Sequence, residues 1–229
     1  QRHALVVGLR EVAEQGQCLR PQVRAGRAKV LRADRQPLTV VGPSDLDLTC
    51  VRHELGVEGG QRGAVSGLVL CGLGDEGGFA PKMKSNEDSL KYIMDAISAA
   101  GYEPGKQIGI CLDVASSEFY NKETGKYRFD GEERDSAYML DYYENLINEY
   151  PIVSIEDPFN EEGWEDWAEI TRRLGDRLQF VGDDLLVTNP ERVRRAIKEN
   201  AANALLVKLN QIGSPTETIE AVETCHRAG

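Results

Sequence analysis

One stretch decides the fold of this chain: residues 151–159, Pro151-Ile152-Val153-Ser154-Ile155-Glu156-Asp157-Pro158-Phe159. A short apolar run closed by proline is typical of a strand buried on both faces, as in a parallel sheet. Because proline lacks an N–H and cannot continue a central strand, the strand has to end at Asp157. Two acids then follow a buried strand, where α/β barrels and open α/β sheets place their active sites. Glu156 could instead cap the helix that follows, or both acids could be solvated loop charges.

Strand and helix patterns take turns on both sides of this stretch. A helix begins after Ser85 and ends at Gly101. Beyond it, apolar runs predict strands and amphipathic periods predict helices, with a polar, glycine-containing insert at 121–134. In chain order they are strand 108–114, helix 136–150, strand 152–155, helix 164–174, strand 178–181, helix 190–200, strand 204–209 and helix 215–226. Such alternation predicts parallel strands joined by right-handed crossovers.

Each predicted strand carries an ionisable residue near its C-terminal end. The spacings are 43 residues from Asp113 to Glu156, 27 from Glu156 to Asp183 and 25 from Asp183 to Lys208. Each step is one strand–helix unit, so all four residues reach the same end of the sheet. Buried strand ends rarely tolerate charge, which makes a chance repetition improbable. We expect an α/β fold that corresponds to about half of a (β/α)8 barrel.

Three carboxylates in one partly dry cavity indicate a cation. Asp113, Glu156 and Asp183 would repel one another strongly unless a positive ion lay between them. Oxygen ligands without a neighbouring His or Cys favour a hard divalent ion, Mg2+ before Ca2+ or Mn2+. Taken singly, each acid could be a helix cap or a surface charge. Asp157 and Asp184 are expected to be supporting or loop residues.

Lys208 and Glu76 are the candidates for proton transfer. Lys208 stands in an otherwise apolar predicted strand, so it either forms a structural ion pair or acts as a base. Desolvation and a nearby Mg2+ would both lower the pKa of Lys208. Glu76 lies in the glycine-rich loop GDEGGFAP, residues 74–81, and could act as an acid on the other side of a substrate. Base, acid and cation together suit proton abstraction next to a carboxylate.

Bulk composition excludes some partners and compartments. The 229 residues carry a net charge of -11 and the isoelectric point is near 4.9, which disfavours nucleic acid or an anionic membrane as the main partner. No apolar run has the length of a transmembrane helix, and no secretory signal pattern opens the sequence. The five cysteines are scattered, without metal-type spacing. Reduced thiols in the cytoplasm are therefore expected.

Residues 1–71 differ in composition from the remainder. They hold no Phe, Tyr, Trp, Met, Ile or Asn, and their ten Lys and Arg against seven Asp and Glu give +3. A segment without aromatic residues or Ile has little with which to build a dense core. We expect two parts: an unrelated or poorly ordered extension at 1–71 and a partial barrel domain at 72–229. The extension could also be non-coding sequence, such as a retained intron or a shifted frame.

Five segments resemble the enolase family, phosphopyruvate hydratase, in family order and with similar spacing over residues 74–229. They are GDEGGFAP at 74–81, LDVASSEFY at 112–120, SIEDPF at 154–159, VGDDLLVTNP at 181–190 and LLVKLNQIGS at 205–214. The resemblance implies a partial (β/α)8 TIM-type barrel of the enolase superfamily, truncated at both ends. It also implies a glycolytic lyase of the cytoplasm, usually homodimeric, that uses Mg2+ to convert 2-phospho-D-glycerate to phosphoenolpyruvate and water.

The resemblance also implies roles for single residues. Lys208 resembles the base that removes the proton beside the carboxylate, and Glu76 resembles the acid that assists loss of the hydroxyl. Asp113, Glu156 and Asp183 resemble the ligands of the first Mg2+, which holds the substrate carboxylate. Substrate binding is thereby expected of Glu156, Asp183 and Lys208.

The chain also departs from the family pattern. Nothing in residues 1–71 resembles the N-terminal α+β domain of enolases with its mobile serine loop. The Ser-His-Arg-Ser loop and a further lysine of the family do not occur, and His226 belongs to the terminal helix. Because positioning supplies a large share of catalysis, we expect little turnover from this chain. A non-catalytic enolase remnant, at most an interaction surface, is the alternative; another acid–lysine member of the superfamily fits GDEGGFAP and SIEDPF less well.

Overall fold

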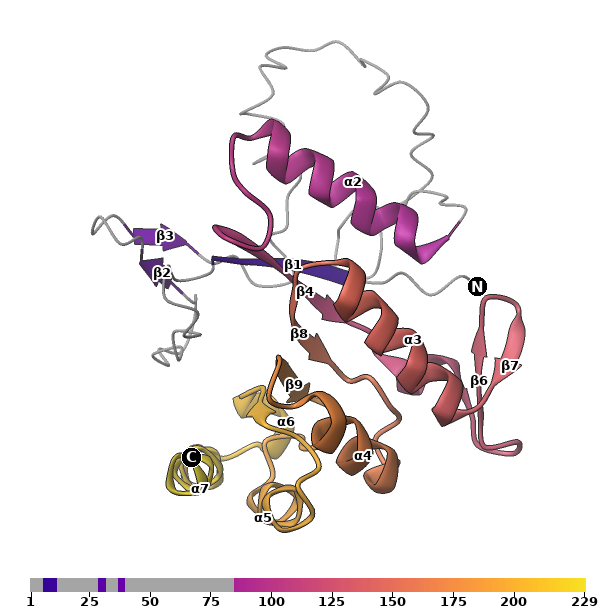
Figure 1. Cartoon of the computed structure of the whole chain (residues 1–229). Helices are drawn as coiled ribbons and strands as arrows, with labels where there is room; N and C mark the ends of the chain where they lie inside the picture. Colours follow the sequence, from indigo (N-terminus) through magenta and orange to yellow (C-terminus); the bar gives the residue numbers. More distant parts are fainter. Residues whose placement is uncertain (1–5, 12–28, 32–36, 40–84) are drawn as a thin grey trace, which may run out of the picture.

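The computed structural model describes residues 6–11, 29–31, 37–39 and 85–229. Its central sheet has the strand order β1-β4-β8-β9-β10 (Figure 1). These strands are β1 Val6–Glu11, β4 Ile108–Asp113, β8 Ile152–Glu156, β9 Gln179–Gly182 and β10 Ala204–Leu205. From β4 to β10 every pairing is parallel, as the alternation predicts, whereas β1 runs antiparallel to β4.

Four of the six helices described in residues 85–229 begin at a residue whose side chain caps the helix. They are α2 Asn86–Ala99, α3 Ser136–Glu149, α4 Trp164–Leu174, α5 Pro190–Glu199, α6 Leu209–Ile212 and α7 Pro215–Ala228. Ser85, Asp135, Asn189 and Ser214 accept backbone N–H groups at the starts of α2, α3, α5 and α7. In Figure 1, α2, α3, α4 and α5 follow one another in an arc around the sheet.

The predicted insert is a small folded sheet of its own. The short helix η2 Ser116–Phe119 leads into β5 Tyr120–Asn121, β6 Lys126–Phe129 and β7 Glu132–Arg134, which pair antiparallel. Tyr127 is fully buried, and its hydroxyl accepts the backbone N–H of Asn160 at 3.2 Å. The insert is therefore anchored to the loop after β8. A separate pair, β2 Lys29–Leu31 and β3 Pro37–Thr39, lies outside the central sheet.

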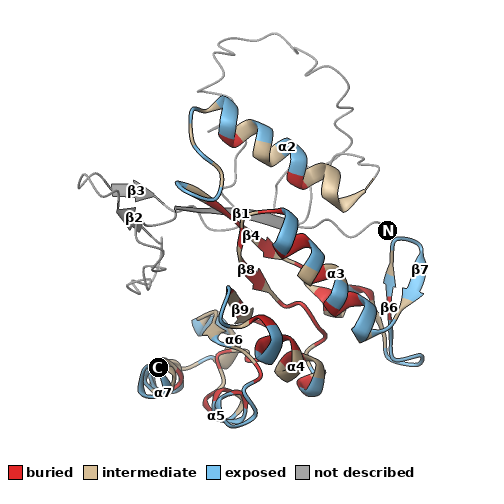
Figure 2. Ribbon diagram, viewed as in Figure 1, coloured by how far each residue is buried: buried red, intermediate tan, exposed pale blue. Residues whose placement is uncertain are grey.

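The hydrophobic core lies between the sheet and the inner faces of the helices. Figure 2 shows buried residues along β4 and β8 and on the sheet-facing sides of α3 and α4. Ile110, Ile155 and Phe180 of the strands and Trp167 of α4 are all completely buried. The Trp167 indole donates to the carbonyls of Phe159 and Asn160, at 3.2 and 3.3 Å. The core thus reaches the loop after β8 and holds it in place.

Two features of the last units differ from the sequence prediction. β10 ends at Leu205, so the predicted strand 204–209 is wrong beyond its second residue, and Lys208 is the residue preceding α6. α4 begins after Gly163, which excludes Glu156 as its cap.

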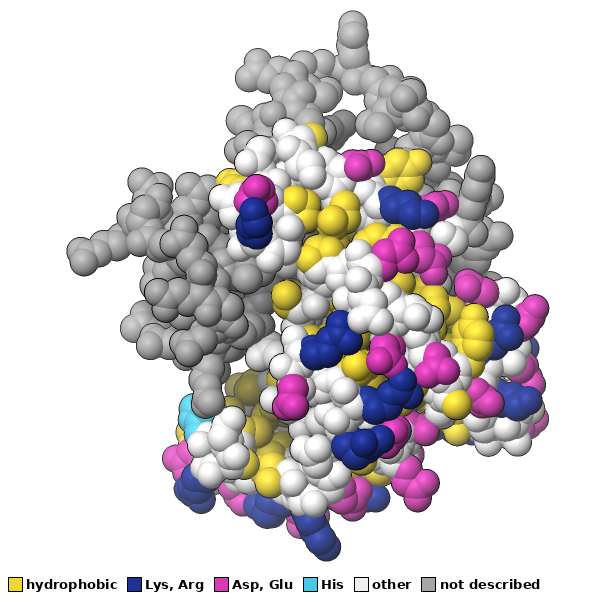
Figure 3. Space-filling model, viewed as in Figure 1, with side chains coloured by type: hydrophobic (Ala, Val, Ile, Leu, Met, Phe, Trp, Pro, Cys, Tyr) yellow, Lys and Arg dark blue, Asp and Glu magenta, His cyan; other side chains and the backbone are white. Residues whose placement is uncertain are grey.

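Lys and Arg side chains mix with Asp and Glu over the face shown in Figure 3. In the part of the chain that is described, no helix has the length and apolar character needed to cross a membrane.

Candidate active site

The parallel register brings the predicted acids to one edge of the sheet. Asp113 and Glu156 are paired residues at the ends of β4 and β8, and Glu156 is opposite Val181 of β9. Asp183 follows two residues later, directly after β9. The amide of Leu206, just after β10, donates to the Gly182 carbonyl at 3.2 Å. Lys208 comes two residues after it, so four successive parallel strands deliver these groups to the same edge.

Asp183 is the residue on which contacts converge. Lys208 Nζ forms an ion pair and hydrogen bond with Asp183 Oδ2. Gln211 Nε2 donates to the other oxygen, Oδ1, at 2.6 Å. Asp183 is only 8% exposed, so these two partners meet a largely buried carboxylate. The side chain that sequence reasoning placed in the metal site is therefore also the partner of the candidate base.

Crowding of the acids changes their ionisation. Burial, together with the charges of Asp113 and Asp183, raises the pKa of Glu156 to about 8. Burial likewise raises the pKa of Asp113 to about 6 against the hydrogen bond from the Ala115 amide. A divalent cation between these carboxylates would remove the repulsion and favour their charged forms. The oxygen-only donor set therefore fits a hard divalent cation.

The ion pair with Asp183 governs the pKa of Lys208. Burial lowers the pKa of this ammonium group, but the hydrogen bond and charge of Asp183, with the charges of Glu156 and Asp113, outweigh burial and raise it above its ordinary value. The predicted lowering depends on a nearby Mg2+ and stays a prediction, and the contact with Asp183 is the structural ion pair that the sequence left open for Lys208. With the carboxylates free of a cation, Lys208 is held protonated.

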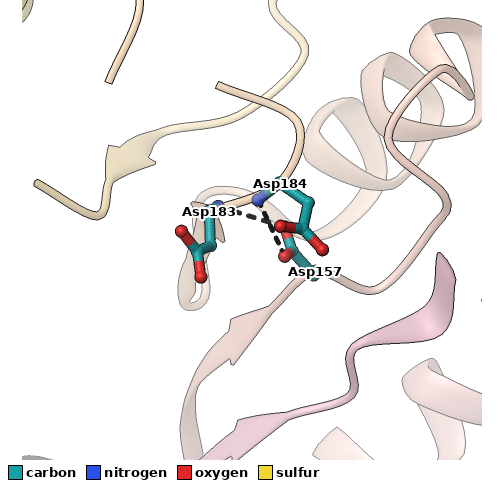
Figure 4. Close-up of side chains that lie close together, drawn as sticks. All are labelled: Asp157, Asp183 and Asp184. Carbon is teal, nitrogen blue, oxygen red and sulfur yellow. Dashed lines mark hydrogen bonds between the residues drawn. The ribbon is translucent and has the colours of Figure 1, made fainter. Parts of the chain in front are cut away.

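The closest group of acids is not the predicted triad. In residues 85–229, one carboxylate oxygen each from Asp157, Asp183 and Asp184 lie within 4.8 Å of one another. Asp157 Oδ1 accepts the amide of Asp183 at 3.1 Å and Oδ2 accepts the amide of Asp184 at 3.0 Å (Figure 4). Burial outweighs the lowering by these two amides and raises the pKa of Asp157 to about 7. Asp183 is the one residue that this group shares with the predicted triad.

Thr188 and Gln211 belong to the same network but were not predicted. Thr188 is fully buried, and its hydroxyl accepts the amide of Lys208 at 2.9 Å and donates to Gln211 Oε1 at 3.2 Å. Its φ of 54° is in the left-handed region, unusual for a β-branched residue. A hydroxyl whose partners lie 20 and 23 residues away leaves no sequence period to detect.

Arg192 of α5 joins two of the site loops from the outside. Its guanidinium donates to the carbonyls of Leu185 and Glu161, and to Glu162 Oε1 at 2.9 Å. It also lies over the Trp164 ring, 5.0 Å from the centroid. The loops after β8 and β9 are therefore tied together on the helix side as well. Glu76 and its loop lie outside the described residues, so its predicted role as acid stays a prediction.

Residues 61–229 match the family described as enolase, C-terminal TIM barrel domain. An enolase of Bifidobacterium longum strain DJO10A is 91% identical over 152 residues, which cover 66% of this chain and 35% of that relative. An enolase of Bifidobacterium adolescentis is 78% identical over 158 residues, covering 69% of this chain and 37% of the relative. An enolase of Bifidobacterium animalis subsp. lactis is 77% identical over 161 residues, covering 70% and 37%. The chain spans about a third of the length of these curated relatives.

Proposed function

The chain belongs to the enolase family through its C-terminal TIM barrel domain, and on that premise we propose that it carries the cation-binding and proton-abstracting part of a phosphopyruvate hydratase. One observation carries the proposal: Asp113, Glu156, Asp183 and Lys208 lie at or just after the C-terminal ends of four consecutive parallel strands. The matched relatives are named enolase. The substrate proposed is 2-phospho-D-glycerate, with phosphoenolpyruvate and water as products.

Asp113, Glu156 and Asp183 would hold the Mg2+ in this proposal. When bound, the cation supplies positive charge that stabilises the substrate carboxylate as negative charge develops on it. The three acids would bind the ion through oxygen, and its charge would offset the burial and the mutual repulsion that raise the pKa values of Asp113 and Glu156.

Lys208 would take the proton from the carbon beside the carboxylate, and Glu76 would donate a proton to the departing hydroxyl. The C–H and C–O bonds break, a carbon–carbon double bond forms and water leaves. For Lys208 to accept a proton, its ion pair with Asp183 has to loosen. Engagement of the Asp183 carboxylate by the cation would weaken that pair and lower the pKa of Lys208.

Mg2+ titration tests the cation site. Wild-type chain is expected to bind Mg2+ in isothermal titration, and Glu156→Gln to bind it far more weakly because a neutral amide replaces a charged ligand. Glu161→Gln is the matched control, since Glu161 pairs with Lys122 at the surface. Unchanged affinity in Glu156→Gln would remove the metal assignment.

Solvent exchange tests proton abstraction separately from product formation. In deuterium oxide with Mg2+, NMR of 2-phospho-D-glycerate should show loss of the proton beside the carboxylate, and Lys208→Ala should abolish that loss. Exchange at the same rate in Lys208→Ala would contradict Lys208 as the base. The same sample, followed by enolpyruvate absorbance, reports whether elimination also occurs.

Homodimer formation and a cytoplasmic location belong to this proposal as properties of the family. A small-molecule substrate, with no nucleic acid or membrane partner, is proposed with them. The negative net charge of -11 supports that choice, because phosphate backbones and anionic lipids would be repelled.

A further inference from the structure

Asp157 connects three consecutive loops at the edge of the sheet where the candidate site lies. Its backbone N–H donates to the Val181 carbonyl at 3.1 Å, and its carbonyl accepts the amide of Ser116 at 3.2 Å. Its carboxylate accepts the amides of Asp183 and Asp184, at 3.1 and 3.0 Å. One residue therefore holds the loop after β4, the loop after β8 and the turn after β9. These are the segments that carry Asp113, Glu156 and Asp183.

We infer that Asp157 is a positioning residue, which fixes the turn at Asp183 through two backbone amides so that the Asp183 carboxylate faces Lys208 and would be placed to hold the cation. The inference rests on the proposed function, because it assigns Asp183 to the cation. Asp113 and Glu156 are proposed to bind the cation directly, whereas Asp157 is inferred to position another ligand, Asp183.

The geometry favours this part over direct ligation. Both oxygens of Asp157 already accept an amide, and the residue is 3% exposed. In Figure 4 the dashed hydrogen bonds run from the Asp183 and Asp184 amides to this carboxylate, while the Asp183 carboxylate is directed away from it. The carboxylate oxygens of Asp183 instead contact the side chains of Lys208 and Gln211.

The backbone conformation at Asp157 supports the positioning role. Its φ of 43° lies in the left-handed region, which short polar side chains tolerate better than bulky ones. This turn of the chain directly after the strand leaves the side chain beside the neighbouring turn at 183–184. Asp157 accepts two hydrogen bonds from backbone N–H groups, which are charge-assisted when the carboxylate is ionised, and these define that turn.

Replacing Asp157 by asparagine keeps the shape and removes half of the contact. The single amide oxygen of asparagine can accept one N–H, whereas its NH2 group would face the other N–H as a second donor. In the folded variant Mg2+ affinity should fall about 10- to 100-fold, as for residues that orient metal ligands. A residue needed only for folding would lower the stability to urea and leave the Mg2+ affinity of the folded molecules unchanged.

The experiment compares wild-type chain, Asp157→Asn and Asp166→Asn by Mg2+ titration and by amide hydrogen exchange. Asp166→Asn is the matched control, because that carboxylate accepts the Ser136 hydroxyl between α4 and α3 at 2.6 Å. Expected results are weakened Mg2+ binding and faster exchange of the Asp183 and Asp184 amides in Asp157→Asn, with neither change in Asp166→Asn. If Asp157→Asn does not fold, wild-type exchange decides: both amides should be protected without Mg2+ and equally protected with it.

Three results would overturn the inference. Wild-type Mg2+ affinity in Asp157→Asn would show that the turn needs no such support. Complete loss of binding with both amides still protected would make Asp157 a direct ligand. Rapid exchange of both amides in the metal-free wild-type chain would mean that the contact is not formed. Absence of Mg2+ binding by the wild-type chain would instead contradict the proposed function itself, and with it the inference that rests on that function.

Discussion

Thr188→Val tests the buried hydroxyl that supports Lys208 from the backbone side. Valine keeps the branched shape of threonine and replaces the hydroxyl by a methyl group. In the structure that hydroxyl accepts the Lys208 amide at 2.9 Å and donates to Gln211 Oε1 at 3.2 Å, and Thr188 is 0% exposed. The change therefore removes two hydrogen bonds at once without altering the volume much.

The expected loss of unfolding free energy depends on whether each former partner of the hydroxyl can be hydrated in the variant. Gln211 is partly exposed, so its freed oxygen can be hydrated and the loss there is small. The Lys208 amide is only partly buried but faces the buried Thr188 side chain, which becomes apolar in the variant. Leaving such a donor unsatisfied costs about 1–3 kcal/mol of unfolding free energy. Because valine is also β-branched, the strain of the left-handed conformation at φ 54° stays the same in the variant.

Urea unfolding followed by tryptophan fluorescence measures this loss. Thr188→Ser is the matched control, because it keeps the hydroxyl and is expected to recover most of the stability that valine loses. Mg2+ titration of both variants shows whether Lys208 and Asp183 have moved. If Thr188→Val unfolds at the urea concentration of the wild type, or if serine and valine lose the same free energy, the hydroxyl contacts do not stabilise the site as argued.

Three other outcomes are expected. Burial raises the folded-state pKa of Glu156 to about 8 from 4.5, so between those values the metal-free folded state holds a proton that the unfolded state has lost. The stability from this group is therefore present below pH 4.5 and falls toward pH 8. The urea midpoint of Glu156→Gln should rise relative to that of the wild type over this range, and a constant difference would contradict the shift. Trp167→Ala should lower the unfolding free energy by about 3–5 kcal/mol, because a fully buried side chain leaves a cavity, and a loss under about 1 kcal/mol would show that the site collapses. Gly182→Ala would place a Cβ 2.6 Å from Leu186 Cγ, so about 1–3 kcal/mol should be lost in thermal unfolding; an unchanged midpoint would mean that Leu186 repacks freely.

Much of this fold can be read along the chain, because its signals are local. The run PIVSIEDPF and the proline that closes it predict β8, and serine, aspartate and asparagine caps predict where helices begin. One acid per strand–helix unit predicts which residues meet, since parallel strands end at a common edge. The short length of β10 has no such signal: the apolar run Ala204–Leu209 looks like a strand throughout, yet the chain leaves the sheet after Leu205.

Side-chain partnerships required the folded chain. The sequence predicts a supporting role for Asp157 beside Glu156 but not its partners, which are the two amides of the turn at 183–184. The sequence left open whether Lys208 forms a structural ion pair, and its contact with Asp183 raises its pKa against the effect of burial. Propensity and periodicity depend on neighbours within a few residues, whereas hydrogen bonds and charge interactions depend on distances of a few ångströms between residues far apart in the chain. The positions of the acids can therefore be predicted from the sequence, whereas the partners of each acid are decided only when the loops pack together.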